Sequence, residues 1–364
     1  MKTKRSLFIN NTLVQGICNY NCIICGINKP TYSGPKAYQS QEVTKKLTER
    51  IKEAIAEGIK IKYVANSGDG EPTLHPEFGK RMNLFGEMIK ELQKKHLPLP
   101  DVYVVTNGSN LRKPGILEAI SDNHLGLNIS FPTSHPEHYG EIMMMKPADG
   151  KRLLKKVVPC IEKAMQFLKN GKLPYLNFHI SPPYREYVRS DFPETLEFLA
   201  NLAKKNKIRE IQLVIFPSTS NRTSLIKHFS KRMDFFKDYF RKYNNKTVFG
   251  VKIKMMLTNK KFYPKRKDLI DILSNFKFPC LVYGNPFITV FGDSCCCNDQ
   301  NLASIEGNIL TMSINQLMNI KENYLPSDVC KRCDQSPERL SGSIDFICYS
   351  SFSFIKKLFF WSVF

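Results

Sequence analysis

The sequence predicts an α/β protein, with a partial (βα)6 barrel followed by a small C-terminal cysteine-rich domain. Short apolar, β-prone runs alternate with amphipathic helical patterns through the first two-thirds of the 364 residues. Strands separated by helices favour parallel βαβ units that form a buried sheet. After residue 278 the chain changes to cysteines and short loops. A chain of this length can contain both parts.

The predicted elements follow this alternation in order. Strands are expected at residues 13–17, 61–66, 102–106, 125–131, 175–180 and 210–216, and helices at residues 40–57, 78–93, 114–121, 151–168 and 192–205. In the first helix Val43, Leu47 and Ile51 recur at helical spacing, and Gly58 follows as a C-cap. Six such units form an incomplete TIM-like barrel rather than a closed eight-fold one.

Four regions follow from these patterns. We expect the barrel at residues 8–225, a basic, helical connecting region at 226–277, the cysteine-rich domain with a helix near 314–320 at 278–349, and an apolar tail at 350–364. The tail is too short to span a bilayer, and no other stretch approaches that length. The N-terminus is too polar for a signal peptide. These observations predict a cytoplasmic protein with no transmembrane segment.

The net charge of +21 has two interpretations. Basic runs at residues 260–261 and 265–267 would suit a nucleic acid or another anionic partner. They also suit a solvated basic surface in a chain rich in Lys, Asn, Ile and Phe. Because no helix-turn-helix or RNA-recognition motif accompanies the charge, the second interpretation is favoured.

The eleven cysteines indicate metal binding or redox chemistry rather than a disulfide framework, if the compartment is reducing. They gather near the two ends of the chain. Only Cys160 lies between the groups, and it is interpreted as a small buried hydrophobe. The N-terminal group is Cys18, Cys22 and Cys25, and the C-terminal group is Cys280, Cys295, Cys296, Cys297, Cys330, Cys333 and Cys348.

The N-terminal group has the spacing C-x3-C-x2-C and follows the first predicted strand, at the end where barrel enzymes place their active sites. Three thiolates can bind three irons of a [4Fe–4S] cluster and leave the fourth iron open for chemistry. The pattern resembles the signature of radical S-adenosylmethionine (radical SAM) enzymes. The resemblance implies that Cys18, Cys22 and Cys25 hold the catalytic cluster. It also implies that SAM binds the open iron and is cleaved to a 5′-deoxyadenosyl radical.

A second motif follows the second predicted strand. Gly70, Glu71 and Pro72 resemble the Gly-Gly-Glu-Pro motif of the same family, with Asp69 where the simplest form has Gly. The resemblance implies that this turn and its carboxylate bind the ammonium group of SAM through charge-assisted hydrogen bonds. Taken alone, the stretch would be an ordinary Gly-Pro turn before a helix.

Polar residues end the third and fourth predicted strands. The family commonly places such residues near the ribose or the carboxylate of SAM, which implies this function for Thr106, Asn107 and Ser130. All three would also fit as ordinary strand-end residues. The sequence departs from the family at Ile24, because an aromatic residue usually precedes the third cysteine.

The C-terminal cysteines resemble the auxiliary-cluster extensions called SPASM and twitch. Cys280, Gly292 and Cys297 fit the C-x(9–15)-G-x4-C element, and Cys330 and Cys333 form a C-x2-C pair. The resemblance implies that Cys280, Cys297, Cys330 and Cys333 hold one auxiliary [4Fe–4S] cluster.

Two alternatives stay open in this C-terminal group. Three cysteines are adjacent, and spacing favours Cys297 as the ligand, with Cys296 next and Cys295 third. A four-thiolate zinc site would use the same residues. Beside a radical SAM core, an iron–sulfur cluster is the favoured interpretation.

The resemblance as a whole implies a radical SAM enzyme that abstracts hydrogen from a substrate. Relatives with such extensions act on peptide or protein side chains, or on sugars and aminocyclitols, so both substrate classes are open. The basic surface would suit an acidic electron donor such as a flavodoxin or ferredoxin. Two other classes are alternatives: an iron–sulfur electron carrier, and a zinc-stabilised nucleic-acid-binding protein.

Overall fold

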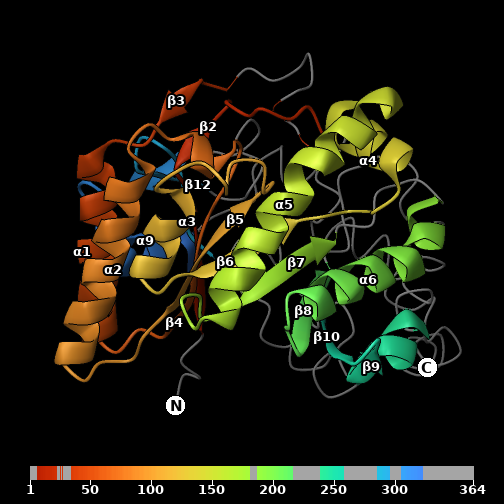
Figure 1. The fold of residues 1–364 in the computed structure, drawn as a ribbon. Helices are drawn as coiled ribbons and strands as arrows, with labels where there is room; N and C mark the ends of the chain where they lie inside the picture. The colour runs from red at the N-terminus through yellow and green to blue at the C-terminus, as the bar shows by residue number, and fades with distance from the viewer. Residues whose placement is uncertain are drawn as a thin grey trace, which may run out of the picture.

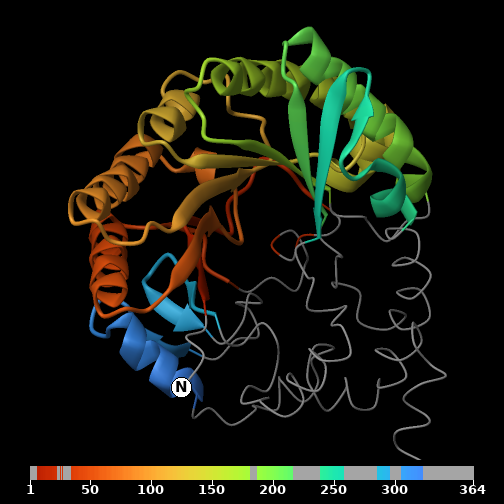
Figure 2. The same ribbon diagram turned by 90° about the horizontal axis from the view of Figure 1, so that it is seen from below.

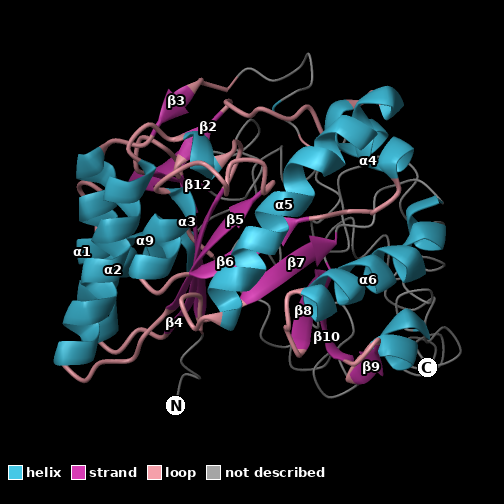
Figure 3. Ribbon diagram, in the orientation of Figure 1, coloured by secondary structure: helices cyan, strands magenta, loops and turns pink. Residues whose placement is uncertain are grey.

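The computed structural model describes residues 6–22, 25, 27, 34–180, 187–215, 238–257, 285–295 and 305–322. In these residues the strands form one large sheet and one small one (Figures 1 and 3). The large sheet has the order β13-β12-β11-β1-β4-β5-β6-β7-β8-β10-β9, and the small sheet pairs β2 with β3. The large sheet curves, and its helices lie on the convex outer face (Figure 2).

The strands divide into a parallel run, the edges of that run and the small sheet. The parallel run contains β1 (Leu7–Thr12), β4 (Ile61–Ser67), β5 (Asp101–Thr106), β6 (Gly126–Ser130), β7 (Leu176–Ile180), β8 (Glu210–Ile215) and β10 (Val251–Leu257). At the edges are β9 (Lys246–Val248), β11 (Phe287–Ile288), β12 (Asp293–Cys295) and β13 (Ile305–Asn308). The small sheet contains β2 (Val14–Gln15) and β3 (Ala37–Tyr38).

Helices connect successive strands of the parallel run, as the alternation predicts. They are α1 (Gln41–Ala56), α2 (Phe78–Lys94), α3 (Ile116–Asp122), α4 (Pro136–Met144), α5 (Gly150–Lys169) and α6 (Tyr187–Lys205), with the 3-10 helices η2 (Pro72–Leu74) and η3 (Pro147–Asp149). A further helix, α9 (Ile314–Glu322), follows β13. The ends of α1 follow its sequence. Val43 N donates to the Ser40 side chain at 3.2 Å, and Gly58 follows the helix with φ +83°.

The predicted α/β fold with a partial barrel is confirmed, but the prediction for its first strand is wrong. Residues 7–12 form β1, which pairs in parallel with β4, whereas residues 13–17 contribute only the short β2. Polar residues hide β1 from a hydrophobicity pattern. They are buried because they bond to β4: Ser67 Oγ donates to Asn10 Oδ1 at 2.5 Å, and Asn11 Nδ2 donates to Asn66 Oδ1 at 2.9 Å.

The predicted connecting region contains a strand that the sequence analysis did not identify. Residues 251–257 form β10, which pairs in parallel with β8 and adds a seventh strand to the run. Its apolar and basic residues alternate, so Val251 and Ile253 are buried while Lys252 and Lys254 lie on the opposite face. A strand at the border of a barrel can have charged residues on one face, so this alternation is compatible with the position of β10. Most of the rest of the predicted basic, helical connecting region at 226–277 lies outside the described residues.

The described part of the cysteine-rich region continues the same sheet. β11 pairs in parallel with β1, and β12 and β13 extend the sheet from it in antiparallel fashion. The helix predicted near 314–320 appears as α9, which contacts α1. The division of the chain into four regions stays a prediction, and the apolar tail lies outside the described residues.

The hydrophobic core lies between the sheet and the helices of the convex face. Ile9, Val64, Leu127 and Phe178 of the strands are fully buried there. Cys160 of α5 belongs to this core with 1% exposure, which confirms its interpretation as a buried hydrophobe. None of the described helices is both long and apolar enough to cross a membrane.

Candidate active site

The turn after β4 packs tightly against the segment that leads to the cysteines. A Cβ on Gly70 would lie 2.4 Å from Val14 O and 2.9 Å from Ile17 O, so only glycine fits at this position. The next residue continues the contact, because Glu71 N donates to Ile17 O at 3.0 Å. The Gly-Glu-Pro turn therefore holds the backbone immediately before Cys18.

The carboxylate of Glu71 is buried and accepts four hydrogen bonds from the protein. Its Oε1 accepts from Thr73 N at 3.2 Å, from Thr73 Oγ1 at 2.6 Å and from Thr106 Oγ1 at 2.5 Å. Its Oε2 accepts from Asn107 N at 2.8 Å. Burial raises the pKa of this carboxyl group, and the hydrogen bonds partly offset that shift. The side chain thus joins the turn to the end of β5.

The residues after β5 connect Glu71 to the cysteine segment. Asn107 Nδ2 donates to Asn19 Oδ1 at 2.9 Å and lies 3.9 Å from Cys18 Sγ. Asn19 Nδ2 in turn donates to Ser109 Oγ at 2.7 Å. The structure therefore brings Thr106 and Asn107 together with the Gly-Glu-Pro turn and Cys18, as expected for strand ends that meet at one barrel mouth.

The cysteine segment is held from both sides. Tyr20 N donates to Cys18 Sγ at 3.3 Å, and Cys25 N donates to Cys22 O at 3.1 Å. On the other side, Asn21 N donates to the backbone oxygen of Met143 at 2.9 Å, and Cys22 Sγ lies 3.8 Å from Met143 Sδ. Met143 is 3% exposed and belongs to the hydrophobic core.

The three thiols form a soft donor set on one short, half-buried segment. Burial raises the pKa of Cys18 to about 12 and also raises that of Cys22, and the negative charge of Cys25 adds to both shifts. In the described residues no three His, Cys, Asp or Glu side chains converge closely enough to hold a metal ion as they stand. The donor chemistry nevertheless fits an iron–sulfur cluster, and cluster binding would have to displace the thiol protons.

The remaining predicted site residues lie further away or outside the described residues. Ser130 ends β6, where it is half-buried and pairs in register with His179 of β7. Gly292 turns the chain between β11 and β12 with φ +84°, and Cys295 is buried in β12. Ile24, Cys280, Cys296, Cys297, Cys330, Cys333 and Cys348 lie outside the described residues.

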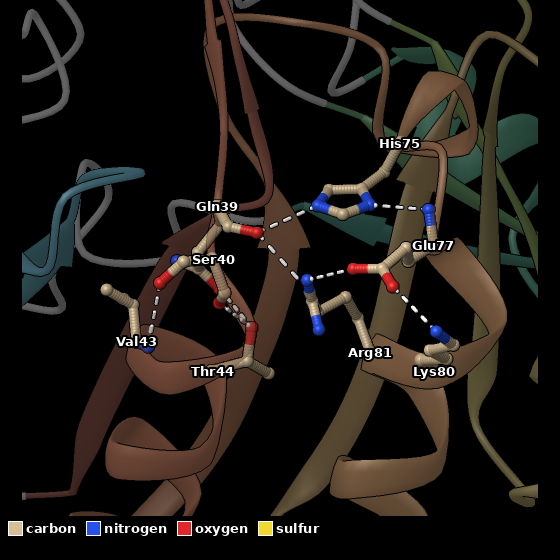
Figure 4. A network of polar contacts seen from close by, with 8 residues as sticks. All are labelled: Gln39, Ser40, Val43, Thr44, His75, Glu77, Lys80 and Arg81. Carbon is tan, nitrogen blue, oxygen red and sulfur yellow. Dashed lines mark hydrogen bonds and ion pairs between the residues drawn. The ribbon is translucent and has the colours of Figure 1, made fainter.

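Gln39 is a buried residue of this region that the sequence did not indicate (Figure 4). Its Nε2 donates to Asn11 Oδ1 at 2.8 Å and to the backbone oxygens of Thr12 and Thr289 at 3.2 and 3.3 Å. Its Oε1 accepts from Thr44 Oγ1 at 2.8 Å. One side chain therefore connects β1, α1 and the segment after β11.

The backbone oxygen of Gln39 extends this network to the Gly-Glu-Pro turn. It accepts from His75 Nε2 at 2.8 Å and from Arg81 Nε at 3.3 Å (Figure 4). Because Glu77 N donates to His75 Nδ1 at 3.0 Å, the imidazole is neutral with its proton on Nε2. Burial lowers the pKa of His75, in agreement with this assignment.

The comparisons with known proteins define the class. The sequence profile of the radical SAM superfamily matches residues 12–199, just over half of the chain. The chain therefore belongs to the radical SAM superfamily, a superfamily of enzymes. Membership implies a [4Fe–4S] cluster and SAM as cofactors, and a reductant and a substrate as partners. No curated protein matches the chain.

Solved structures support the fold. SuiB of Streptococcus suis bound to its precursor peptide SuiA is similar with a TM-score of 0.55 at 11% identity, over 86% of this chain and 64% of SuiB. The protein anSMEcpe with bound AdoMet is similar with a TM-score of 0.57 at 17% identity, over 88% of this chain and 83% of that chain. The chain thus spans less than two thirds of SuiB.

Proposed function

We propose that this chain reductively cleaves SAM at a [4Fe–4S] cluster and abstracts a hydrogen atom from a substrate bound in the barrel. The observation that supports the proposal best is the contact network around Glu71. It joins the Gly-Glu-Pro turn, the end of β5 and the backbone before Cys18 in a chain of the radical SAM superfamily. The electron-carrier and nucleic-acid-binding alternatives gain no support from this network or from the family match.

Each part of the network has a function in this proposal. Cys18, Cys22 and Cys25 would hold the cluster, which supplies the electron that cleaves SAM to methionine and a 5′-deoxyadenosyl radical. Asn107 and Asn19 fix the backbone beside Cys18. Gly70 lets the turn approach this backbone, and the curved sheet shields the reaction from water.

We also propose an auxiliary [4Fe–4S] cluster, held by Cys280, Cys297, Cys330 and Cys333. Their spacing supports it, and so does Gly292, whose positive φ explains the glycine of the C-x(9–15)-G-x4-C element. Cys295 lies within β12, where it pairs in register with Phe287 and Ile305, and spacing favours Cys297 as the ligand.

The partners are proposed as classes. A basic protein of net charge +21 suits an acidic reductant such as a flavodoxin or ferredoxin. For the substrate, the two classes are a peptide or protein side chain, as the peptide-bound SuiB structure suggests by analogy, and a sugar or aminocyclitol.

The first test is SAM cleavage by protein reconstituted with iron and sulfide without oxygen. After reduction with dithionite, we expect the wild type to convert SAM to 5′-deoxyadenosine, measured by mass spectrometry. Cys22→Ala should lose at least about a hundredfold of this activity, because one cluster ligand is gone. The matched control is Cys160→Ala, which removes a buried thiol of α5 and should retain both cluster and cleavage.

Three results would count against the proposal. A cluster that leaves SAM intact, with or without candidate substrates, would favour an electron carrier. Zinc in place of iron would make the cysteines structural. If Cys22→Ala and Cys160→Ala lost SAM cleavage equally, the loss would reflect lower protein stability and not a missing cluster ligand.

A further inference from the structure

The inner face of the curved sheet can be assigned from contacts on its outer face. Side chains alternate between the two faces of a strand, so one assigned residue fixes its neighbours. A Cβ on Gly108 would lie 3.0 Å from Ile129 Cγ2 and 3.7 Å from Val157 Cγ1 of α5, so Ile129 faces the helices. Asn128 and Ser130, on either side of Ile129, therefore face away from the helices and toward the inside of the barrel.

Aromatic side chains occupy this inner face near the start of the strands. A Cβ on Gly126 would lie 2.1 Å from Tyr175 Cζ, and Tyr175 OH donates to Asp101 Oδ1 at 2.7 Å. The rings of Tyr63 and Tyr103 meet edge to face, with centroids 6.4 Å apart. These contacts link β4, β5 and β6 with Tyr175, the residue before β7. The aromatic side chains therefore cover the inner face near the start of the strands.

A row of amide side chains crosses the inner face above these rings. Asn128 of β6 is in register with Asn177 of β7, and Asn177 with Gln212 of β8. We call these three residues the amide row. Ser130 and His179 are the next inward-facing residues toward the barrel mouth, two positions after Asn128 and Asn177. The amide row therefore lies about 7 Å deeper in the barrel than Ser130 and His179.

Two members of the amide row have an unused acceptor. Asn128 and Asn177 are 4% and 5% exposed, and the Oδ1 atom of each is buried without a hydrogen-bond partner in the described structure. Buried polar atoms are nearly always paired in folded proteins, because an unpaired one costs free energy. Two such atoms in register on adjacent strands therefore point to a ligand that donates hydrogen bonds.

The described residues that adjoin the amide row are neutral overall. Lys254 of β10 is the next residue in register, but its Nζ lies 2.6 Å from Glu210 Oε1. His179, above Asn177 on the same face, is uncharged at neutral pH because burial lowers its pKa to about 3. Among the described residues in register with it, the row therefore has no spare cation for a carboxylate or phosphate.

We propose that the amide row is the floor of the substrate site, and that the substrate is a small, neutral, polyhydroxylated molecule of the sugar or cyclitol class. This inference rests on the proposed function and specifies its substrate. A hydroxyl group can donate to an amide oxygen and accept from an amide nitrogen, so it matches both halves of each side chain. Adjacent strands lie about 5 Å apart, so the outer two amides are separated by about 10 Å. Gln212 Nε2 already donates to Met256 Sδ at 2.7 Å, so its oxygen is the part of the third amide that a ligand hydroxyl would meet. Several hydroxyls on one molecule are needed to meet all three side chains.

A peptide substrate fits the amide row less well. One serine or threonine side chain would satisfy one amide and leave the others unpaired. Peptide binding at this row is therefore the result that would contradict the proposal.

The test is a binding measurement on the reconstituted protein with SAM present. The probes are myo-inositol and D-glucose as neutral polyols, D-glucuronate as an anion, and N-acetyl-seryl-amide as a peptide unit, each titrated by calorimetry to millimolar concentrations. We expect saturable binding of at least one polyol, and weaker or no binding of the other two probes. No binding of either polyol, or preference for the peptide unit, would overturn the proposal.

The variants are Asn128→Leu and Asn177→Leu, which replace an unpaired amide with an apolar side chain of similar size. Each should weaken polyol binding at least about tenfold, since a recognition hydrogen bond is lost. Each should melt no lower than the wild type. The matched control is Asn206→Leu at the end of α6, which should bind the polyol normally.

SAM cleavage without substrate separates this inference from the proposed function. If Asn128→Leu and Asn177→Leu still form 5′-deoxyadenosine but do not bind the polyol, the amide row binds substrate. If they lose cleavage as well, the row belongs to the SAM site and the inference is wrong. If the wild type binds polyol but never cleaves SAM, the proposed function fails while the binding site stands.

Discussion

At the scale of single residues, the site depends on buried polar groups whose partners come from distant parts of the chain. Glu71 is an example, because burial alone would favour its neutral form. Donors from Thr73, Thr106 and Asn107 compensate by surrounding both carboxylate oxygens. The same bonds fix the positions of the turn and the strand end, so Glu71 aligns two backbone segments that meet at the mouth, while its contact with SAM stays a prediction.

His179 gives a prediction about pH at this scale. Burial lowers its pKa to about 3, whereas an unfolded histidine titrates near 6.5. Between these values the unfolded chain binds a proton that the folded chain does not, so stability is lost as pH falls below about 6.5. Near pH 5.5 the loss should be about 1.4 kcal/mol relative to pH 8.

Urea unfolding at several pH values measures this effect. The quantity of interest is the stability difference between the wild type and His179→Leu, because subtraction removes the other titrating groups. The exposed His96 supplies the control variant, His96→Leu. If the stability difference between the wild type and His179→Leu is the same at pH 8 and pH 5.5, His179 is not buried in its neutral form.

At the scale of elements, Gln39 determines how β1, α1 and the Gly-Glu-Pro segment fit together. Substitution by Met keeps the length of the side chain but removes its donors and its acceptor. Asn11 Oδ1 and the backbone oxygens of Thr12 and Thr289 then lose a buried partner. We expect Gln39→Met to lower the free energy of unfolding by about 2–3 kcal/mol.

The comparison for Gln39→Met is Gln166→Met on the exposed side of α5. That control should change stability by less than about 0.5 kcal/mol in the same urea titration. Gln39→Met should also retain less iron after desalting, because the network adjoins the segments on either side of the cysteines. Equal stability and equal iron content of the two variants would show that the network is dispensable.

The elements that the sequence predicts well are those with a local signal. The apolar spacing of Val43, Leu47 and Ile51 and the cap at Ser40 predict α1 to within one residue at each end. Strands β4 to β8 have apolar residues at the positions that face the helices, such as Leu127 and Ile129 of β6, and this spacing is a local signal. β1 lacks that signal because Asn10 and Asn11 are satisfied by partners on β4, more than fifty residues away.

The site residues also divide into those with a local sequence signal and those without one. Cys18, the Gly-Glu-Pro turn and Thr106 could be predicted to share the mouth, because each comes at the carboxyl end of a strand. The Glu71–Thr106 hydrogen bond and the Gln39 network could not be predicted, since no local pattern links residues so far apart. Their contacts depend on the register of the sheet, which only the folded chain defines.

At the scale of the whole molecule, the sheet unites the two ends of the chain. β11 pairs with β1, and Thr289 beyond it accepts a hydrogen bond from Gln39. The cysteines of the C-terminal group flank this strand in sequence. An auxiliary cluster bound by these cysteines would thus be attached to the same sheet edge as the segment that contains Cys18, Cys22 and Cys25. Loss of that cluster should therefore also lower the stability of the protein.

Iron content tests this arrangement. With two [4Fe–4S] clusters, the reconstituted wild type should bind about 8 irons per chain, and Cys18→Ala or Cys330→Ala should each bind about 4. Cys160→Ala should match the wild type, since that thiol is buried in the core. The two cluster variants should differ in function: Cys18→Ala loses SAM cleavage, while Cys330→Ala keeps the cleavage that occurs without substrate. About 4 irons in the wild type, or zinc bound in a Cys330-dependent manner, would leave the catalytic cluster intact and remove the auxiliary one from the proposal.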